Sequence, residues 1–261
     1  MTLEQAFSIG DSEVISLVGG GGKTTLMYAL GRELSSHRKG IILTTTTKIM
    51  EPKPSSFFLQ FFSHELGEVK KWVAENIHRR HCLLIVRERL PNGKFQGIFP
   101  EWVEEISCMD GVSTIVNEAD GSAGRPLKAL REGEPVIPKN TTLLVPVMGI
   151  DGMGRPLDEE SVFRSAIASR LLKLPIGSMV TEDVIARLMK ELMKSCPAGA
   201  RVVPLINKVD IPGGLEKAQK LAEYLLSIDP PGIRRVVLGR LRHFPAVQVI
   251  VPTGLSPTHE E

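Results

Sequence analysis

An apolar run that stops at four consecutive glycines constrains this chain more than any other feature. Residues 14–18 read Val-Ile-Ser-Leu-Val, residues 19–22 are all glycine, and a Lys-Thr-Thr triplet follows. β-Branched residues favour a strand, and leucines at four-residue intervals after the triplet favour a helix over about 24–36. The pattern therefore predicts a strand, a glycine loop and a helix in direct succession.

The glycine loop is predicted to bind the phosphates of a nucleotide. Glycines let backbone N–H groups turn inward without Cβ clashes, and the helix directs its positive N-terminal end to the same point. We expect Lys23 to reach the β- and γ-phosphates and the Thr24 hydroxyl to ligate Mg²⁺. The residues predicted to bind the nucleotide here are Gly19, Gly20, Gly21, Gly22, Lys23, Thr24 and Thr25.

The loop is shorter than the common phosphate-binding loop, in which four residues separate the first glycine from Gly-Lys-Ser/Thr. Counting back from Gly22 places that first glycine at Leu17, so the usable pattern is Gly-x-x-Gly-Lys-Thr-Thr. Loops of this length are seen in P-loops of the Mur-ligase type. The alternative interpretation is a glycine turn that is followed by lysine and threonine by chance.

A second apolar strand, predicted over 113–117, delivers Glu118 and Asp120 to the edge of the expected sheet. Carboxylates at such a strand end hold Mg²⁺ and orient water in phosphoryl-transfer enzymes. Asp120 is the first choice of metal ligand and Glu118 the second. Both are also candidate catalytic residues, together with Lys23.

A glycine-flanked segment that carries Arg125 and Lys128 follows this acidic strand end. We expect it to be a mobile loop whose basic pair binds phosphate or a second anionic substrate. The sequence shows no obvious arginine finger, the arginine that stabilises transition-state charge in many GTPases. Arg125 and Arg155 are the candidates for this role, and Arg125 is also a candidate catalytic residue. The alternative is a surface loop with scattered charges.

Four threonines, residues 44–47, close the strand predicted over 40–43, and Lys48 follows them. In an open parallel sheet, ligands bind outside the carboxyl ends of the strands. A row of hydroxyls there suits Mg²⁺ or phosphate, and Thr45 is a candidate metal ligand. The alternative is that threonine simply favours β-structure.

The strand predicted over 200–206 ends in Asn207-Lys208-Val209-Asp210. Asn-Lys-x-Asp is the guanine-reading motif of GTPases, in which the aspartate accepts hydrogen bonds from N1–H and the exocyclic amine of guanine. Adenine lacks this arrangement of donors, and an unpaired buried carboxylate is costly. We therefore expect Asn207, Lys208 and Asp210 to bind the base of a purine nucleotide, with GTP favoured and ATP possible.

The order of strand and helix signals predicts an α/β fold, a P-loop NTPase-like three-layer sandwich with a mainly parallel sheet. We expect a single domain over 1–261. A Pro-Asn-Gly turn at 91–93 lies between two strand-like runs and predicts a β-hairpin, which we interpret as a flap inserted within 51–112. Further helices are predicted over 158–173 and 181–195.

Composition excludes several classes of function. A net charge of +2 over 261 residues gives no reason to expect a nucleic-acid partner. No apolar stretch approaches the roughly 18 residues of a membrane span, and the N-terminus does not resemble a signal peptide. The three cysteines are far apart and are expected to be buried thiols in a reducing compartment, the cytoplasm.

Taken in order, these motifs resemble those of the YqeC family. The resemblance rests on stretches that span nearly the whole chain: residues 19–25, 43–48, 118–128, 134–138, 149–157 and 207–210. Members of that family are regarded as accessory proteins for selenium cofactor biosynthesis that serve selenium-dependent molybdenum hydroxylases. The resemblance implies such a hydroxylase, or its cofactor-maturation proteins, as a partner, while Mg²⁺ and a purine nucleotide are the cofactors expected from the motifs.

Three functions are compatible with these residues. The first is a GTPase chaperone that couples hydrolysis to maturation of such a hydroxylase. The second is a kinase or ligase that activates a selenium or pterin intermediate, which the Mur-like loop and the Arg125/Lys128 pair favour. The third is a nucleotide-gated binding protein without catalysis. The arrangement also resembles nickel-enzyme GTPase chaperones, but their metal-binding Cys or His element is missing from this sequence.

Overall fold

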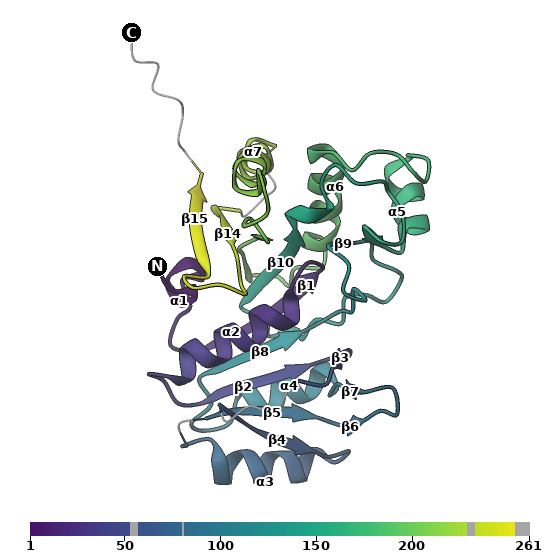
Figure 1. Ribbon diagram of the computed structural model, residues 1–261. Coiled ribbons are helices and arrows are strands. Elements are labelled where there is room, and N and C mark those ends of the chain that lie inside the picture. The colour runs from purple at the N-terminus through teal and green to yellow at the C-terminus, as the bar shows by residue number, and fades with distance from the viewer. Residues whose placement is uncertain (53–56, 80, 229–232, 254–261) are drawn as a thin grey trace.

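A computed structural model describes residues 1–52, 57–79, 81–228 and 233–253 (Figure 1). In these residues the main sheet has the strand order β15-β14-β13-β10-β1-β8-β2-β5-β4, and β12 also pairs with β10. Its described pairs are parallel except for the antiparallel β14–β15 pair. The strands are β1 (Glu13–Gly19), β2 (Ile41–Thr45), β4 (Phe58–Phe62), β5 (Cys82–Val86), β8 (Thr114–Glu118), β10 (Leu143–Gly149), β12 (Arg201–Val202), β13 (Leu205–Asn207), β14 (Arg235–Gly239) and β15 (Val247–Pro252).

Helices cover both faces of this sheet, which is the predicted three-layer α/β sandwich of the P-loop NTPase type (Figure 1). On one face lie α1 and α2. On the other face α3 lies near β4 and β5, α4 near β8, α6 near β10 and β1, and α7 near β14, with α5 beside α6. The helices are α1 (Leu3–Phe7), α2 (Lys23–Ser35), α3 (Leu66–Asn76), α4 (Pro100–Ser107), α5 (Ser165–Leu172), α6 (Glu182–Met193) and α7 (Gly214–Ser227), and a 3₁₀ turn, η1 (Ile150–Gly152), follows β10.

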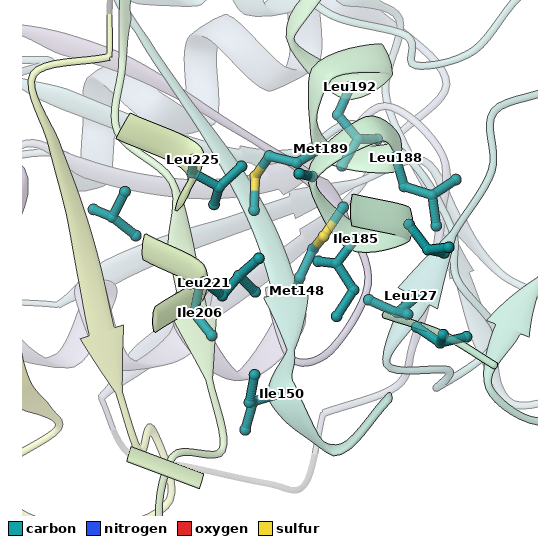
Figure 2. Packing of buried hydrophobic residues seen from close by; sticks show 14 of the residues in the cluster. Leu127, Met148, Ile150, Ile185, Leu188, Met189, Leu192, Ile206, Leu221 and Leu225 are labelled. Carbon is teal, nitrogen blue, oxygen red and sulfur yellow. The ribbon is translucent and has the colours of Figure 1, made fainter. Parts of the chain in front are cut away.

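The core between α6 and the sheet supports the end of β10. Ile185, Leu188, Met189 and Leu192 form one stripe along α6, at the spacing that places residues on one helix face. Figure 2 shows this stripe lying against Met148 of β10, and all five side chains are at most 1% exposed. Because burying one such side chain contributes about 1.5–3 kcal/mol, this packing holds β10 firmly in place.

Two smaller sheets lie beside the main one. An antiparallel sheet contains β3 (Lys48–Met50), β7 (Lys94–Gln96) and β6 (Glu88–Arg89), and a parallel pair joins β9 (Leu127–Lys128) to β11 (Val162–Phe163). The hairpin predicted at 91–93 is therefore present as β6–β7, with β3 as an unexpected third strand. Of the other described strands in 51–112, β4 and β5 belong to the main sheet, so the flap consists of the hairpin.

The helix predicted over 158–173 begins later than expected. Residues 158–164 form turns and β11, and α5 starts only at Ser165. The side chain of Asp158 accepts hydrogen bonds from two backbone amides that follow it, a local turn that competes with helix formation. The helix predicted over 181–195 is confirmed as α6.

The cysteines differ in exposure, which corrects the expectation that all three are buried. Cys82 is buried in β5, Cys196 is half-buried, and Cys108 is exposed because it lies at the end of α4. In the part of the chain that the structure describes, the helices are too short or too polar to cross a membrane.

Candidate nucleotide site

A cavity of about 860 Å³ lies at the carboxyl ends of β1, β2, β8, β13 and β14, where ligands bind in open α/β sheets. Small-molecule sites measure roughly 300–1,000 Å³. Eight lysine and arginine side chains and three carboxylates are among its described lining residues, which leaves an excess of five positive charges. The cavity therefore suits an anionic ligand.

The structure brings most of the predicted site residues to this cavity. Those that line it are Gly21, Gly22, Lys23, Thr24, Thr25, Glu118, Asn207, Lys208 and Asp210. The others, which are not among its described lining residues, are Gly19, Gly20, Thr45, Asp120 and Arg125.

The glycine loop is wedged against the end of β10. Gly19 and Gly21 have φ values of +98° and +73°, in the left-handed region that favours glycine. A Cβ on Gly21 would lie 2.1 Å from the backbone nitrogen of Gly149, and one on Gly19 would lie 2.4 Å from the Val147 carbonyl oxygen. Because both neighbours are backbone atoms of a packed strand, only glycine fits at these two positions.

The first three amides of the loop already have acceptors within the protein. They donate to the Asp120 carboxylate and to the carbonyls of Val147 and Arg125, at 3.0, 2.8 and 2.9 Å. The first amides of a helix have no partner inside the helix. The candidate phosphate cradle is therefore the start of α2, residues 22–25, and not the predicted stretch 19–22.

Lys23 lies on the floor of the cavity with its side chain 2% exposed. Its ammonium is 2.5 Å from the Gly19 carbonyl oxygen, 3.2 Å from a carboxylate oxygen of Asp120 and 3.7 Å from one of Glu118. A buried cation needs such compensation. These three contacts hold the ammonium between the glycine loop and the two carboxylates.

Thr24 and Glu118 meet at the cavity wall, where the Thr24 hydroxyl donates to a Glu118 carboxylate oxygen at 2.7 Å. The register of β1 and β8 pairs Leu17 with Glu118, which brings the carboxylate level with the glycine loop. Burial raises the pKa of Glu118, and Lys23 and Thr24 partly offset this effect. A hydroxyl and a carboxylate are oxygen ligands of the kind that Mg²⁺ prefers.

Asp120 and Lys128 form an ion pair behind the loop that corrects two expectations. Lys128 Nζ is 2.9 Å from Asp120 and 2.7 Å from Glu134, and the side chains of Lys128 and Asp120 are fully buried. Lys128 is therefore part of β9 and not of a mobile surface loop. Asp120 faces this ion pair instead of the cavity, so Glu118 is the better placed metal ligand.

Glu134 contacts three cations. Arg164 binds it with two hydrogen bonds of 2.5 and 2.7 Å, and Lys128 and Arg131 approach within 2.7 and 3.0 Å. Burial acts to raise the pKa of Glu134, but hydrogen bonds from Arg164 and Lys128 outweigh it and lower the pKa to about 2. Together with Asp120, this network links the glycine loop to β9 and to the start of α5.

Asn207, the first residue of the predicted base-reading motif, ties two loops together. Its side-chain amide donates to the Gly21 carbonyl at 2.8 Å, and its oxygen accepts from the Leu241 amide at 3.1 Å. It is buried at the end of β13. The residue thus fixes the distance between the glycine loop and the segment after β14.

Lys208 and Asp210 are more exposed than Asn207. The Lys208 ammonium pairs with Asp151 at 2.7 Å, whereas the Asp210 carboxylate is 3.2 Å from His243 and lines the cavity. One third of the Asp210 side chain is exposed (33%). The carboxylate is accessible to a ligand, as the guanine interpretation requires.

The threonine row contributes hydrogen bonds within the fold. The hydroxyls of Thr44, Thr45 and Thr46 donate to backbone carbonyls of neighbouring segments at 2.7, 2.7 and 2.5 Å. Thr45 bonds the carbonyl of Glu118, so it supports the candidate metal ligand from behind. These contacts fit the alternative interpretation, in which the threonines serve the β-structure, better than they fit metal ligation by Thr45.

The two candidate arginine fingers are not among the described residues that line the cavity. The Arg125 guanidinium donates to the Glu159 carbonyl at 2.5 Å, and Arg155 is exposed. The basic residues at the cavity that sequence reasoning missed are Lys94, Arg131, Arg164, Arg240, Arg242 and His243. Arg240 and Arg242 directly follow the apolar run Val236-Val237-Leu238 of β14, which is a usable signal, whereas Arg164 is placed by its tertiary contact with Glu134.

These features define the class of protein: a P-loop NTPase-like α/β sandwich with a glycine loop on its central strand. The family described as "YqeC protein" matches residues 15–166. The chain is also 30% identical over 237 residues to "Uncharacterized protein YqeC" of Escherichia coli (strain K12), with 90% of each chain covered. The chain therefore belongs to the YqeC family, as the motifs predicted.

Proposed function

We propose that this protein binds a purine nucleoside triphosphate with Mg²⁺, preferring GTP, and hydrolyses it slowly. The observation that carries the proposal is the Thr24–Glu118 hydrogen bond, which lies in a positively charged cavity beside the buried Lys23. Oxygen ligands, a buried cation and the first amides of α2 then lie together at one end of the cavity. Phosphoryl-transfer sites need this combination.

Each residue at this point has a distinct role in the proposal. The amides of 22–25 donate to the phosphates, and Lys23 turns from the Gly19 carbonyl to a phosphate oxygen. Thr24 and Glu118 hold the Mg²⁺, which supplies neutralisation of phosphate charge when bound. Asp120 keeps its contact with the loop, so the loop stays anchored while the ligand binds.

The other end of the cavity supports a preference for guanine. Asp210 presents a partly exposed carboxylate that can accept the two donors of guanine, and Asn207 holds the surrounding loops in place. Glu134 is a poor general base, because Arg164 and Lys128 outweigh its burial and hold its pKa at about 2. Slow turnover in the absence of a partner is the expected consequence.

Membership of the YqeC family supports the biological part of the proposal. The role is that of a cytoplasmic accessory protein in the maturation of selenium-dependent molybdenum hydroxylases. Such a hydroxylase, or one of its cofactor-maturation proteins, is then the partner that accelerates GTP turnover.

The test is calorimetric titration of GTP and of ATP, each with Mg²⁺, into the wild type and Asp210→Ala. We expect the wild type to prefer GTP and the variant to lose about 10- to 100-fold of that preference, since hydrogen bonds to a charged group contribute about 1.5–3 kcal/mol. Asp110→Ala removes an exposed carboxylate outside the described cavity lining and serves as the matched control.

Two outcomes contradict different parts of the proposal. Equal binding of ATP and GTP to the wild type removes the assignment of Asp210 as a base reader and leaves the phosphate site intact. Failure of both nucleotides to bind overturns the phosphate site itself.

A further inference from the structure

The cavity is lined by more cations than a nucleotide site uses. Lys23, Lys208, Arg240 and Arg242 belong to the glycine loop and to the segments after β13 and β14. A second set, here called the outer basic group, comes from other elements: Lys48 of β3, Lys94 of β7, and Arg131 and Arg164 beside Glu134. The proposed phosphate and base contacts leave this group without a ligand.

Sheet order separates Lys48, and with it the small sheet of β3 and β7, from the base-binding end. In the main sheet β13 and β14 lie on one side of β1, whereas β8 and β2 lie on the other, and β3 directly follows β2 (Figure 1). The glycine loop after β1 is between them. A nucleotide that reaches from Asp210 to Lys23 therefore directs its terminal phosphate toward the small sheet that carries Lys48 and Lys94.

The small sheet presents its lysines to the cavity. Met50 pairs with Lys94 and Lys48 pairs with Gln96 in the β3–β7 register, so all four side chains lie on one face. The residues between them in each strand, Ile49 and Phe95, are 2% and 0% exposed and pack in the core. In the part of the chain that the structure describes, neither Lys48 nor Lys94 has a carboxylate partner.

The other two members of the outer basic group, Arg131 and Arg164, also belong to a cluster with unbalanced positive charge. Arg131, Arg164 and Lys128 share one carboxylate, that of Glu134, and Lys128 also neutralises Asp120. The Arg131 side chain is 65% exposed. Planar guanidinium groups and lysines without a carboxylate partner recognise phosphate oxygens through charge-assisted hydrogen bonds.

We propose that the outer basic group binds a second, phosphate-bearing small molecule next to the terminal phosphate of the nucleotide. This inference rests on the proposed function, because it defines the second ligand relative to the nucleotide. It assigns the protein a two-substrate cavity, as in a nucleotide-dependent kinase or ligase. The apolar surfaces of Met50 and Phe163, which also line the cavity, are available to the uncharged part of that molecule.

The test is a titration of inorganic phosphate into protein saturated with Mg²⁺ and guanosine 5′-[β,γ-imido]triphosphate, which fills the γ-phosphate position. We expect phosphate to bind the wild type and to bind Lys48→Gln/Lys94→Gln at least ten-fold more weakly. The matched control is Lys71→Gln/Lys139→Gln, which removes two exposed lysines outside the described cavity lining. This control is expected to bind phosphate like the wild type.

The outcomes distinguish this inference from the proposed function. The second site is overturned if the nucleotide analogue binds but phosphate does not, or if the two double variants bind phosphate equally well. Neither outcome contradicts the nucleotide site. If the nucleotide analogue does not bind, the proposed function fails. Phosphate titration of the nucleotide-free double variants then still decides whether the outer basic group binds anions.

Discussion

The glycine-loop end and the base-reading end of the cavity stabilise their charges in different ways. At the loop, Lys128 and Asp120 pair with fully buried side chains. At the base end, Lys208 pairs with Asp151 at a similar distance, but 35% and 20% of these side chains are exposed. Water screens the second pair and not the first, so the two contacts contribute very differently to stability. The Lys128–Asp120 pair lies in the core, whereas the Lys208–Asp151 pair is partly exposed to water.

The largest effect is expected at the loop end, for Lys128→Met. This substitution leaves the carboxylates of Asp120 and Glu134 without their shared cation, and breaking a buried ion pair in this way costs about 3–5 kcal/mol. Denaturant unfolding measures the change. Lys139→Met, on an exposed side chain, should stay within about 0.5 kcal/mol of the wild type. A loss below about 1 kcal/mol for Lys128→Met would remove the contrast between the two ends.

Thr24→Val tests whether Thr24, at the glycine-loop end of the cavity, is a ligand of Mg²⁺. The variant keeps the shape of the side chain but loses the hydroxyl that donates to Glu118. We expect GTP affinity in the presence of Mg²⁺ to fall about 10- to 100-fold, with little change in binding when EDTA removes the metal. Ser36→Ala, just after the other end of α2, is the control. Equal losses with and without Mg²⁺ would argue against metal ligation by Thr24.

Acid should lower the stability of the folded protein by protonating Glu134 at the glycine-loop end. The pKa of this carboxyl is lowered from 4.5 to about 2 in the folded protein, so its stabilising effect is present above pH 4.5 and is lost as the pH falls toward 2. With solvent screening included, the loss is on the order of 1–2 kcal/mol. Thermal unfolding between pH 7 and pH 3 should show a smaller decline for Glu134→Gln, whereas exposed Glu132→Gln should follow the wild type.

The smallest effect is expected at the base end, for Lys208→Met. This variant makes the same chemical change as Lys128→Met, at a similar ion-pair distance, on a partly exposed side chain. The free energy of unfolding should fall by about 1 kcal/mol or less. A loss as large as that of Lys128→Met would show that exposure is not what distinguishes the two ends.

Local sequence patterns predicted the architecture well because each carries its own physical cause. The strand, glycine loop and helix around residues 14–36 follow from β-branched residues, glycine and leucine spacing, and all three are present. The hairpin at 91–93 follows from turn chemistry. The helix predicted over 158–173 began late, because the Asp158 side chain bonds nearby amides and competes with the helix, an effect that hydrophobic spacing does not reveal.

The sequence predicted which kinds of side chain meet at the candidate site, but not which of them face the cavity. Lys23, Thr24 and Glu118 do meet, because parallel strands end at one edge. Sequence spacing could not tell that Asp120, only two residues from Glu118, faces the ion pair with Lys128. Both carboxylates contact Lys23, and what separates them is the second contact of each: Thr24 at the cavity for Glu118, and the buried Lys128 for Asp120.

The sequence by itself determined the order of elements, the glycine loop and its Lys-Thr-Thr, and membership of the YqeC family, because these depend on neighbouring residues or on motif order. Tertiary structure decided which polar groups are buried together. Pairing across the fold placed Lys128 between Asp120 and Glu134, Arg164 on Glu134, and the lysines of β3 and β7 at the cavity. A charge's role depends on its desolvation and its partners, and both come from segments distant in the chain.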